Sequence, residues 1–435
     1  MPETDWVDRT VADCLEVSFA GEWGSEPNPA NALVLRATDI DDAGHVVGAG
    51  AARSIPMSKL RAKQLQDGDV LLEGSGGGPG KPVGRVALFE ADSHDGPAIC
   101  SNFFKTLRPK RSLVDHRFLW RKLGWFYTQP ALLALQQQTT GIINLKFAEY
   151  LDARLQLPAD VHEQAKIAEV LDTLDTTIRQ TEAIIEKLKQ VKQGLLHDLL
   201  TRGIDANGEL RPPQSQAPHL YKDSPLGWIP REWAASSIDE ACSDVVDCPH
   251  STPNFLDDGV LVARTMHIKA GVFLERLASR VSEAEYVDRI SRLRPEPGDV
   301  VFTREAPVGE AFVIPVGMRV CLGQRVMLLR PRPENARGQF LLAQIYSGAV
   351  ADRIAALTAG TTNPHLNVAE VRQFILPLPP VAEQIVIEQQ LGGLGGRIAV
   401  EGAVRDKLLT LKSGLMDDLL TGRVRVTPLL RAAAA

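Results

Sequence analysis

The chain has 435 residues, 44% of them hydrophobic, which is enough material for two independent cores. Its formal net charge of −6, taken by itself, argues against nucleic-acid binding, and no apolar run approaches the length of a membrane span. The first ten residues carry charges where a signal peptide would be apolar, and five cysteines without paired spacing indicate reduced thiols. These features predict a cytoplasmic protein without membrane contact.

Residues 1–158 are predicted to form one globular domain of the α+β (mixed α/β) class. Short apolar runs bounded by Gly, Pro or Asp, such as Val70–Leu72 and Val86–Phe89, predict strands. The segment Arg117–Leu135 predicts a helix.

Basic residues outnumber acidic ones between Lys105 and Lys122, and this cluster includes Lys110 and Arg111. Two interpretations fit it equally well. The cluster either lies along a phosphate backbone or forms a solvated helix face.

Residues 159–202 are predicted to form one long helix. Its apolar residues alternate in steps of four and three over about five heptads, which favours a coiled coil over a helix lying on a globular core. The interface positions expected in this helix are Ile167, Leu171, Leu174, Ile178, Leu188 and Leu195.

Residues 203–223 predict a linker, because Asn-Gly and Pro-Pro pairs interrupt regular structure and apolar residues are few. The segment 224–379 then repeats the first domain in the same order. Gly68-Asp69-Val70 recurs as Gly298-Asp299-Val300, with a second helix expected over Gly338–Leu357. A repeat of about half the chain length indicates a duplicated unit.

Residues 380–421 repeat the first long helix without a gap, and a tail of residues 422–435 follows. Glu163-Gln164 recurs as Glu383-Gln384, and both copies end in Leu-Leu-Thr. The interface positions expected in the second helix are Ile387, Leu391, Leu394, Ile398, Leu408 and Leu415. Its glycines at 392, 393, 395, 396 and 402 each cost roughly 1 kcal/mol relative to alanine. Either tertiary packing holds this stretch, or the glycines let another helix or subunit approach closely.

Motifs that would carry catalysis do not match. Gly74–Lys81 follows a strand but lacks the first glycine and the Ser/Thr of a phosphate loop. No acid lies two residues before any lysine, as restriction-type nucleases would require, and neither Pro-Pro pair fits the motif of amino-group methyltransferases. Cys248 and His250 are two residues apart, but no second pair completes a zinc site. The chain is therefore predicted to be non-catalytic, and a nuclease or methyltransferase fused to a recognition unit is excluded.

The duplicated architecture resembles the specificity subunit of type I restriction-modification systems over nearly the whole chain. The resemblance rests on Ser224–Trp233, on the two Gly-Asp-Val motifs, and on the two Glu-Gln helices that end in Leu-Leu-Thr. It implies two target-recognition domains, each reading half of a bipartite site in double-stranded DNA. It also implies that the two long helices form an antiparallel coiled coil, which separates the domains and docks the methyltransferase subunits.

The same resemblance implies that the cofactors belong to partner subunits. Methyltransferase subunits would bind S-adenosylmethionine, and restriction (motor) subunits would use ATP and Mg²⁺, so this chain would bind none of these. The alternative function is a coiled-coil adaptor without DNA specificity, which would share the helices but would not explain the paired polar loops.

Loop residues able to form bidentate contacts with base edges are the candidates for DNA contact. They lie after the Gly-Asp-Val strands and in two matched polar loops, 136–140 and 361–365. The candidates are Thr303, Arg304, Lys81, Arg85, Gln138, Thr140, Thr362 and Asn363, together with Lys110 and Arg111 of the basic cluster.

Overall fold

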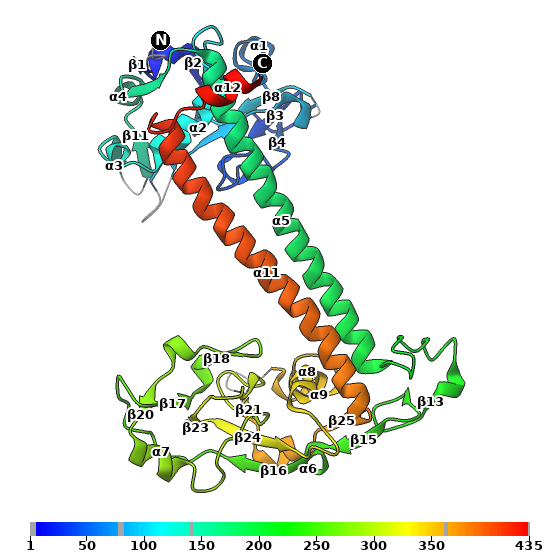
Figure 1. Cartoon of the computed structure of the whole chain (residues 1–435). Coiled ribbons are helices and arrows are strands. Elements are labelled where there is room, and N and C mark those ends of the chain that lie inside the picture. The colour runs from blue at the N-terminus through cyan, green and yellow to red at the C-terminus, as the bar shows by residue number, and fades with distance from the viewer. Residues whose placement is uncertain (1–5, 77–81, 95, 140–141, 361–363, 434–435) are drawn as a thin grey trace. The chain divides into compact units, whose positions relative to one another are not determined.

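The structure is a computed structural model that describes residues 6–76, 82–94, 96–139, 142–360 and 364–433. The chain forms two compact units: residues 1–182 with 403–435, and residues 183–402. Each unit contains one globular domain and a part of each long helix (Figure 1).

Short strands and helices make up the globular domain of the first unit. Its strands are β1 (Trp6–Thr10), β2 (Leu15–Ala20), β3 (Ala32–Leu35), β4 (Ala51–Arg53), β5 (Val70–Glu73), β6 (Ser75–Gly76), β7 (Val86–Leu88), β8 (Ala98–Cys100), β9 (Phe104–Pro109), β10 (Gln136–Thr139), β11 (Ile142–Leu145) and β12 (Arg154–Pro158). Its helices are α1 (Met57–Lys63), α2 (His116–Tyr127), α3 (Pro130–Leu133) and α4 (Phe147–Leu151).

The second unit has a domain of the same kind. Its strands are β13 (Tyr221–Lys222), β14 (Ile229–Pro230), β15 (Ala234–Ser237), β16 (Cys242–Asp247), β17 (Val260–Ala263), β18 (Ile268–Lys269), β19 (Val272–Phe273), β20 (Arg280–Val281), β21 (Val300–Thr303), β22 (Ala311–Val313), β23 (Val320–Leu322), β24 (Val326–Pro331) and β25 (Ile375–Leu378). Its helices are α6 (Ile238–Ala241), α7 (Glu283–Arg289), α8 (Gly338–Tyr346), α9 (Ala349–Thr358) and α10 (Val368–Arg372).

The two domains have the same strand order, which confirms the duplication. An antiparallel sheet runs β2-β9-β5-β7 in the first domain and β16-β24-β21-β22 in the second. A second sheet runs β4-β3-β8 and β20-β17-β23, and its pairs β3–β8 and β17–β23 are parallel. Two-stranded ladders, β1–β12 and β15–β25, lead into the long helices.

Both helices expected within the domains are broken in two. The first divides into α2 and α3 because Pro130, which has no N–H to donate, begins a new helix. The second divides into α8 and α9 at Gly348, whose φ of 116° lies outside helical backbone. The structure therefore confirms that both segments are helical, whereas the prediction that each segment forms one continuous helix is wrong.

The two long helices are α5 (Val161–Thr201) and α11 (Val381–Leu420), and they pair antiparallel within each unit (Figure 1). In the first unit, Lys412 Nζ lies 2.6 Å from Asp175 Oδ1. In the second unit, Lys192 Nζ is the group closest to the face of Gly395. Both contacts fit one register, which confirms the antiparallel coiled coil. A short helix, α12 (Thr427–Ala433), follows α11.

Each long helix ends in a core that it did not start in. Ile167 and Leu171 at the start of α5 share the core of the first unit with Leu419 and Leu420 at the end of α11. Leu199 and Leu200 at the end of α5 share the core of the second unit with Ile387 of α11. The repeated Leu-Leu-Thr ending is therefore a hydrophobic anchor.

The segment expected to be a compliant linker is held in place. Arg211 Nη1 and Nη2 lie 2.5 and 3.0 Å from the Glu383 carboxylate, and the Tyr221 hydroxyl donates to the Pro212 carbonyl at 2.7 Å. Arg211 is only 6% exposed, so its charge is buried with its partner. Among the described residues, no single helix is long and apolar enough to cross a membrane; only α8 and α9 together reach that length, with a bend of 46°.

Candidate nucleic-acid interface

The aspartate of each Gly-Asp-Val motif holds an arginine of the neighbouring strand. Arg108 donates from Nε and Nη2 to Asp69 at 2.9 and 2.8 Å. Arg330 donates in the same way to Asp299, again at 2.9 and 2.8 Å. Bidentate pairs of this kind are strong and geometrically specific. The motif therefore fixes β5 against β9 and β21 against β24, below the loops that follow β5 and β21.

In the second unit the loop that follows the Gly-Asp-Val strand meets the described end of the predicted polar loop 361–365. The Leu366 N–H donates to the Arg304 carbonyl at 3.0 Å, and Glu305 forms an antiparallel bridge with His365. The Glu305 carboxylate also lies 3.0 Å from Nδ1 of His365 and 3.3 Å from Nε of Arg325. The loop after β21 and the residues that follow position 363 thus form one surface.

Arg304 lies inside this junction and not on its surface. Its side chain is 6% exposed, Nη2 lies 3.0 Å from Asp247, and Nη1 donates to the Leu366 carbonyl at 3.1 Å. A charge this deeply buried requires such a partner. Thr303 is also buried, and its hydroxyl accepts the Glu310 N–H at 2.9 Å. The base contacts predicted for Arg304 and Thr303 stay predictions, and the observed contacts are those of positioning residues.

The first unit has the same junction with smaller side chains. The Leu145 N–H donates to the Gly74 carbonyl at 2.9 Å, and Ser75 pairs with Asn144 between β6 and β11. The Ser75 hydroxyl donates to Oδ1 of Asn144 at 2.8 Å. One backbone arrangement therefore presents different side chains in the two domains.

Arg85 forms an ion pair beside this junction. Its Nε donates to the Glu73 carboxylate at 3.0 Å, and this hydrogen bond raises the pKa of Arg85. Glu73 is only 5% exposed, whereas the Arg85 side chain keeps 29% of its surface exposed. The predicted DNA contact of Arg85 remains a prediction.

Several predicted residues fall outside what the structure describes. They are Lys81, Thr140, Thr362 and Asn363, together with the side chain of Gln138. The predicted polar loop 136–140 is wrong for its described part, because residues 136–139, which include Gln138, form the strand β10. In the same strand, Oε1 of Gln136 accepts the Val83 N–H at 3.0 Å and Nε2 donates to the Val83 carbonyl at 2.9 Å. The side chain of Gln136 therefore stabilises the backbone at Val83.

The basic cluster is divided between the interior and the surface. Arg117 and Arg121 on α2 lie 3.1 and 2.7 Å from Asp172 on α5, and Arg121 is 5% exposed. These arginines attach the domain to the long helix, which neither interpretation of the cluster anticipated. Lys110 and Arg111 are exposed, and Arg111 Nη2 donates to the Asp67 carbonyl at 2.7 Å. Their phosphate contacts stay predictions.

Lys122 on α2 is buried against the C-terminal end of α11. Its Nζ donates to the Leu420 carbonyl at 2.5 Å and lies 5.8 and 4.6 Å from the ring centroids of Trp6 and Trp125. Burial lowers the pKa of Lys122 to about 8. A cation at this place satisfies an otherwise unpaired helix-terminal carbonyl.

The most buried of the expected interface positions lie near the start of each long helix. Ile167, Leu171 and Ile387 have no exposed surface. Leu174 and Ile178 are 9% and 6% exposed. The positions that keep partial exposure are Leu188, Leu195, Leu391, Leu394, Ile398, Leu408 and Leu415.

The glutamine of each Glu-Gln pair closes the ladder that precedes its helix. Gln164 donates to the Pro158 carbonyl at 2.7 Å and accepts the Asp115 N–H at 2.9 Å. Gln384 repeats these contacts with the Pro379 carbonyl at 2.9 Å and the N–H of Arg337 at 3.0 Å. The pair marks the place where domain, ladder and helix join.

The glutamate of each pair holds the segment that follows the other long helix. Arg425 donates to Glu163 from two nitrogens at 2.8 Å each. Glu383 accepts from Arg211 and, at 3.1 Å, from the indole N–H of Trp233.

Trp6 corresponds to Trp233, although its flanking sequence does not show this. Trp6 stands opposite Pro158 in the β1–β12 ladder, and Trp233 directly precedes Ala234, which stands opposite Leu378 in the β15–β25 ladder. A side chain at Gly422 would meet the Trp6 ring, and one at Gly203 would meet the Trp233 ring. The usable signal was Leu-Pro at 157–158 and 378–379, because Trp6 pairs with Pro158 and Trp233 directly precedes the residue that pairs with Leu378.

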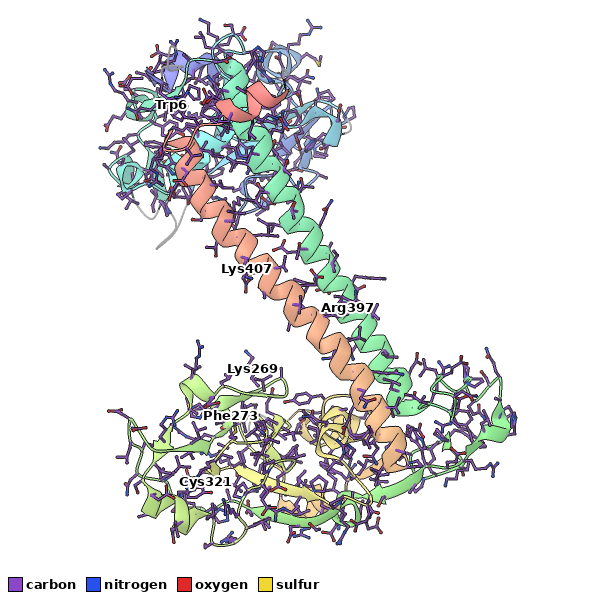
Figure 2. The ribbon with its side chains drawn as sticks, viewed as in Figure 1. Trp6, Lys269, Phe273, Cys321, Arg397 and Lys407 are labelled. Carbon is purple, nitrogen blue, oxygen red and sulfur yellow. The ribbon has the colours of Figure 1, made fainter. Side chains whose placement is uncertain are left out.

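Exposed basic side chains lie on two other elements. Figure 2 shows Lys269 on the β18–β19 hairpin, where Phe273 stacks on Phe312 with ring centroids 4.8 Å apart. On α11, Arg397 and Lys407 are exposed (Figure 2). Sequence reasoning singled out none of these three cations, because nothing local distinguishes an exposed cation from a paired one.

Among the described residues, no group of three or more His, Cys, Asp or Glu side chains is placed to hold a metal ion. Cys248 is buried, and His250 lies 3.3 Å from Asp247, the partner of Arg304. The Asp-Cys-Pro-His segment thus belongs to the frame of the junction.

Comparisons with known proteins agree on one family. The model of the type I restriction modification DNA specificity domain matches residues 51–190 and 262–409. The type I restriction enzyme MjaVIII specificity subunit of Methanocaldococcus jannaschii is 23% identical over 340 residues, which are 75% of each chain. The putative MjaX specificity subunit of the same organism is 21% identical and covers 98% of this chain and 95% of its own. The S subunit of the type I restriction-modification system of M. genitalium has a similar fold, with a TM-score of 0.54, 14% identity and 96% of both chains covered.

Proposed function

This chain belongs to the type I restriction-modification DNA specificity family, and we propose that it reads a bipartite double-stranded DNA site, one half with each globular domain. Specificity subunits are the non-catalytic members of these systems. The observation that carries the proposal is the repeated scaffold: two domains with one strand order hold the same loop junction with different side chains. A duplicated frame with divergent loops suits two different half-sites.

The proposed partners are methyltransferase subunits, docked on the paired helices, and restriction subunits that join the complex. The outer face of α11 supports docking, because a Cβ added at Gly392, Gly393 or Gly396 would meet no atom of the described residues within 4 Å beyond the helix's own neighbouring backbone. S-adenosylmethionine, ATP and Mg²⁺ would bind to the partners. We place the complex in the cytoplasm, which suits five buried, unpaired cysteines.

Methyl transfer tests the assignment. The purified chain, incubated with DNA and labelled S-adenosylmethionine, should transfer no methyl groups, whereas the chain co-purified with its methyltransferase subunit should methylate one bipartite motif. Transfer by the chain alone would contradict the proposal. DNA binding by the complex that lacks both sequence preference and salt dependence would instead favour a coiled-coil adaptor.

A further inference from the structure

A third loop joins each junction, and it is the one that sequence reasoning missed. In the second domain, the Arg304 N–H donates to the carbonyl of Arg325, in the β23–β24 loop, at 2.9 Å. In the first domain, the Gly74 N–H donates to the carbonyl of Phe103, in the β8–β9 loop, at 2.8 Å. Arg325 and Phe103 therefore occupy the same place on the two frames.

With this third loop, each domain holds a cluster of three side chains on matched backbone. In the second domain, Glu305 lies between Arg325 and His365, whose side chains are 57% and 53% exposed. The first-domain equivalents of these three residues are Ser75, Phe103 and Asn144.

The backbone contacts of the two clusters are alike, yet the chemistry of the side chains is not. The second cluster is ionic, and the first combines a hydroxyl, an amide and a phenyl ring that is 46% exposed. Side chains that only stabilised the junction would serve it equally well in both domains. One backbone frame that presents different exposed side chains is what two different ligands require.

The backbone at Arg325 supports a role outside the fold. Its φ is 67°, in the left-handed region that disfavours an arginine, and its side chain forms an ion pair with Glu305 at 3.3 Å. Non-glycine residues held in this region tend to mark binding sites.

We propose that these clusters are the base-reading centres of the two domains: Ser75, Phe103 and Asn144 select an A·T pair in one half-site, whereas Glu305, Arg325 and His365 select a G·C pair in the other. The inference rests on the proposed function and adds the residues and base pairs to it. Arginine pairs with O6 and N7 of guanine and glutamate accepts from cytosine N4, while asparagine pairs with adenine and a phenyl ring contacts the thymine methyl group.

The test uses the chain co-purified with its methyltransferase subunit. Methylome sequencing first gives the wild-type motif, and binding is then measured on duplexes in which each base pair of that motif is changed singly. Arg325→Ala and Glu305→Gln should lose roughly 5- to 150-fold discrimination at one or two adjacent G·C pairs of one half-site. Asn144→Ala should do the same at an A·T pair of the other half-site.

Two control variants distinguish a loss of base reading from a loss of folding. Arg325→Lys keeps the charge and the stem but loses the planar fork, so it should bind DNA and still lose discrimination at the same base pair. Arg319 precedes β23, at the end of the strand opposite Arg325, and pairs with Glu283 at 2.6 Å. The control variant Arg319→Ala should therefore leave every base preference unchanged.

Unchanged discrimination in Arg325→Ala and Glu305→Gln would overturn the assignment. A uniform loss of affinity across all duplexes would also overturn it, because that is the signature of a phosphate contact. A wild-type complex without any sequence preference would contradict the proposed function itself.

Discussion

Lys412 on α11 and Asp175 on α5 form an ion pair of 2.6 Å between the two long helices, at a point where Asp175 is only 6% exposed. Arg121 of α2 contacts the same carboxylate. One buried anion thus joins both helices and the first domain.

Asp175→Asn should destabilise the first unit. The substitution removes the counter-charge of Lys412 and leaves Arg121 with Asp172 alone, and breaking a buried pair in this way costs ~3–5 kcal/mol. Thermal or denaturant unfolding of the full chain measures this. Asp406→Asn, on an exposed stretch of α11, is the matched control and should change stability by less than about 0.5 kcal/mol.

The same carboxylate gives a pH dependence. Burial opposes ionisation of Asp175, but Arg121 and Lys412 together hold its pKa below the ordinary value of 3.8. A depressed carboxylate pKa stabilises the folded state above the unfolded value, and this stabilisation is lost as pH falls through the folded one. Wild type should therefore lose more stability than Asp175→Asn below about pH 4. Parallel acid-unfolding curves for the two proteins would contradict this.

Arg304→Met separates positioning from base contact. Removing the guanidinium leaves Asp247 without its buried partner, so we expect the free energy of unfolding to fall by ~3–5 kcal/mol. The double variant with Asp247→Asn should recover part of that loss, as measured by a double-mutant cycle. If Arg304 instead contacts a base, Arg304→Ala should weaken the second half-site by ~1–3 kcal/mol without recovery in the double variant.

Exchange of the first domain should change one half-site only. Replacing residues 1–157 with the equivalent segment of a relative should alter one half of the methylated motif and leave the other intact. Leu419, Leu420 and Arg425 belong to the first unit. A chimera in which residues 415–435 are also replaced by the relative's equivalent segment should therefore melt at a higher temperature than the chimera with residues 1–157 replaced alone. A change in both half-sites would show that the domains are not modular.

The helices should set the gap between the half-sites. One heptad inserted in both helices, after Glu186 and after Val400, keeps the seam in register and lengthens each helix by ~10 Å. At ~3.4 Å per base pair this adds about three base pairs to the gap. Methylome sequencing of the variant should return the same half-sites with a longer gap. Methylation of the original motif at normal efficiency would rule the helices out as the ruler.

The glycines of α11 should lower the free energy of unfolding of the chain without its partners. The structure keeps this stretch helical, and a Cβ at Gly392, Gly393 or Gly396 meets open space. Replacing the three with alanine should therefore raise the free energy of unfolding by ~1–3 kcal/mol in total. The same variant should assemble less well with the methyltransferase subunit if a partner helix approaches this face, and size-exclusion chromatography of the mixture checks that. Unchanged assembly would remove this face from the docking surface.

Local patterns predicted the frame of the molecule, and long-range partners decided the rest. The heptads of α5 and α11 are periodic in the chain itself, so their pairing could be predicted. The ion pairs of Arg121 could not be predicted, because its partners Asp172 and Asp175 lie about fifty residues away in the sequence, on another helix. Arg325 and Phe103 were missed for the same reason: only the hydrogen bonds of the folded junction bring their loops to the predicted ones.

The first unit is assembled from both ends of the chain, since Trp6 packs on Gly422 and Glu163 binds Arg425. The second unit is complete within residues 183–402. On the ribosome, the second unit can therefore close while the first still waits for the last turn of α11 to be synthesised. Until then the Trp6 ring lacks the Gly422 backbone that packs on it, so the half that is translated first is the half that finishes folding last.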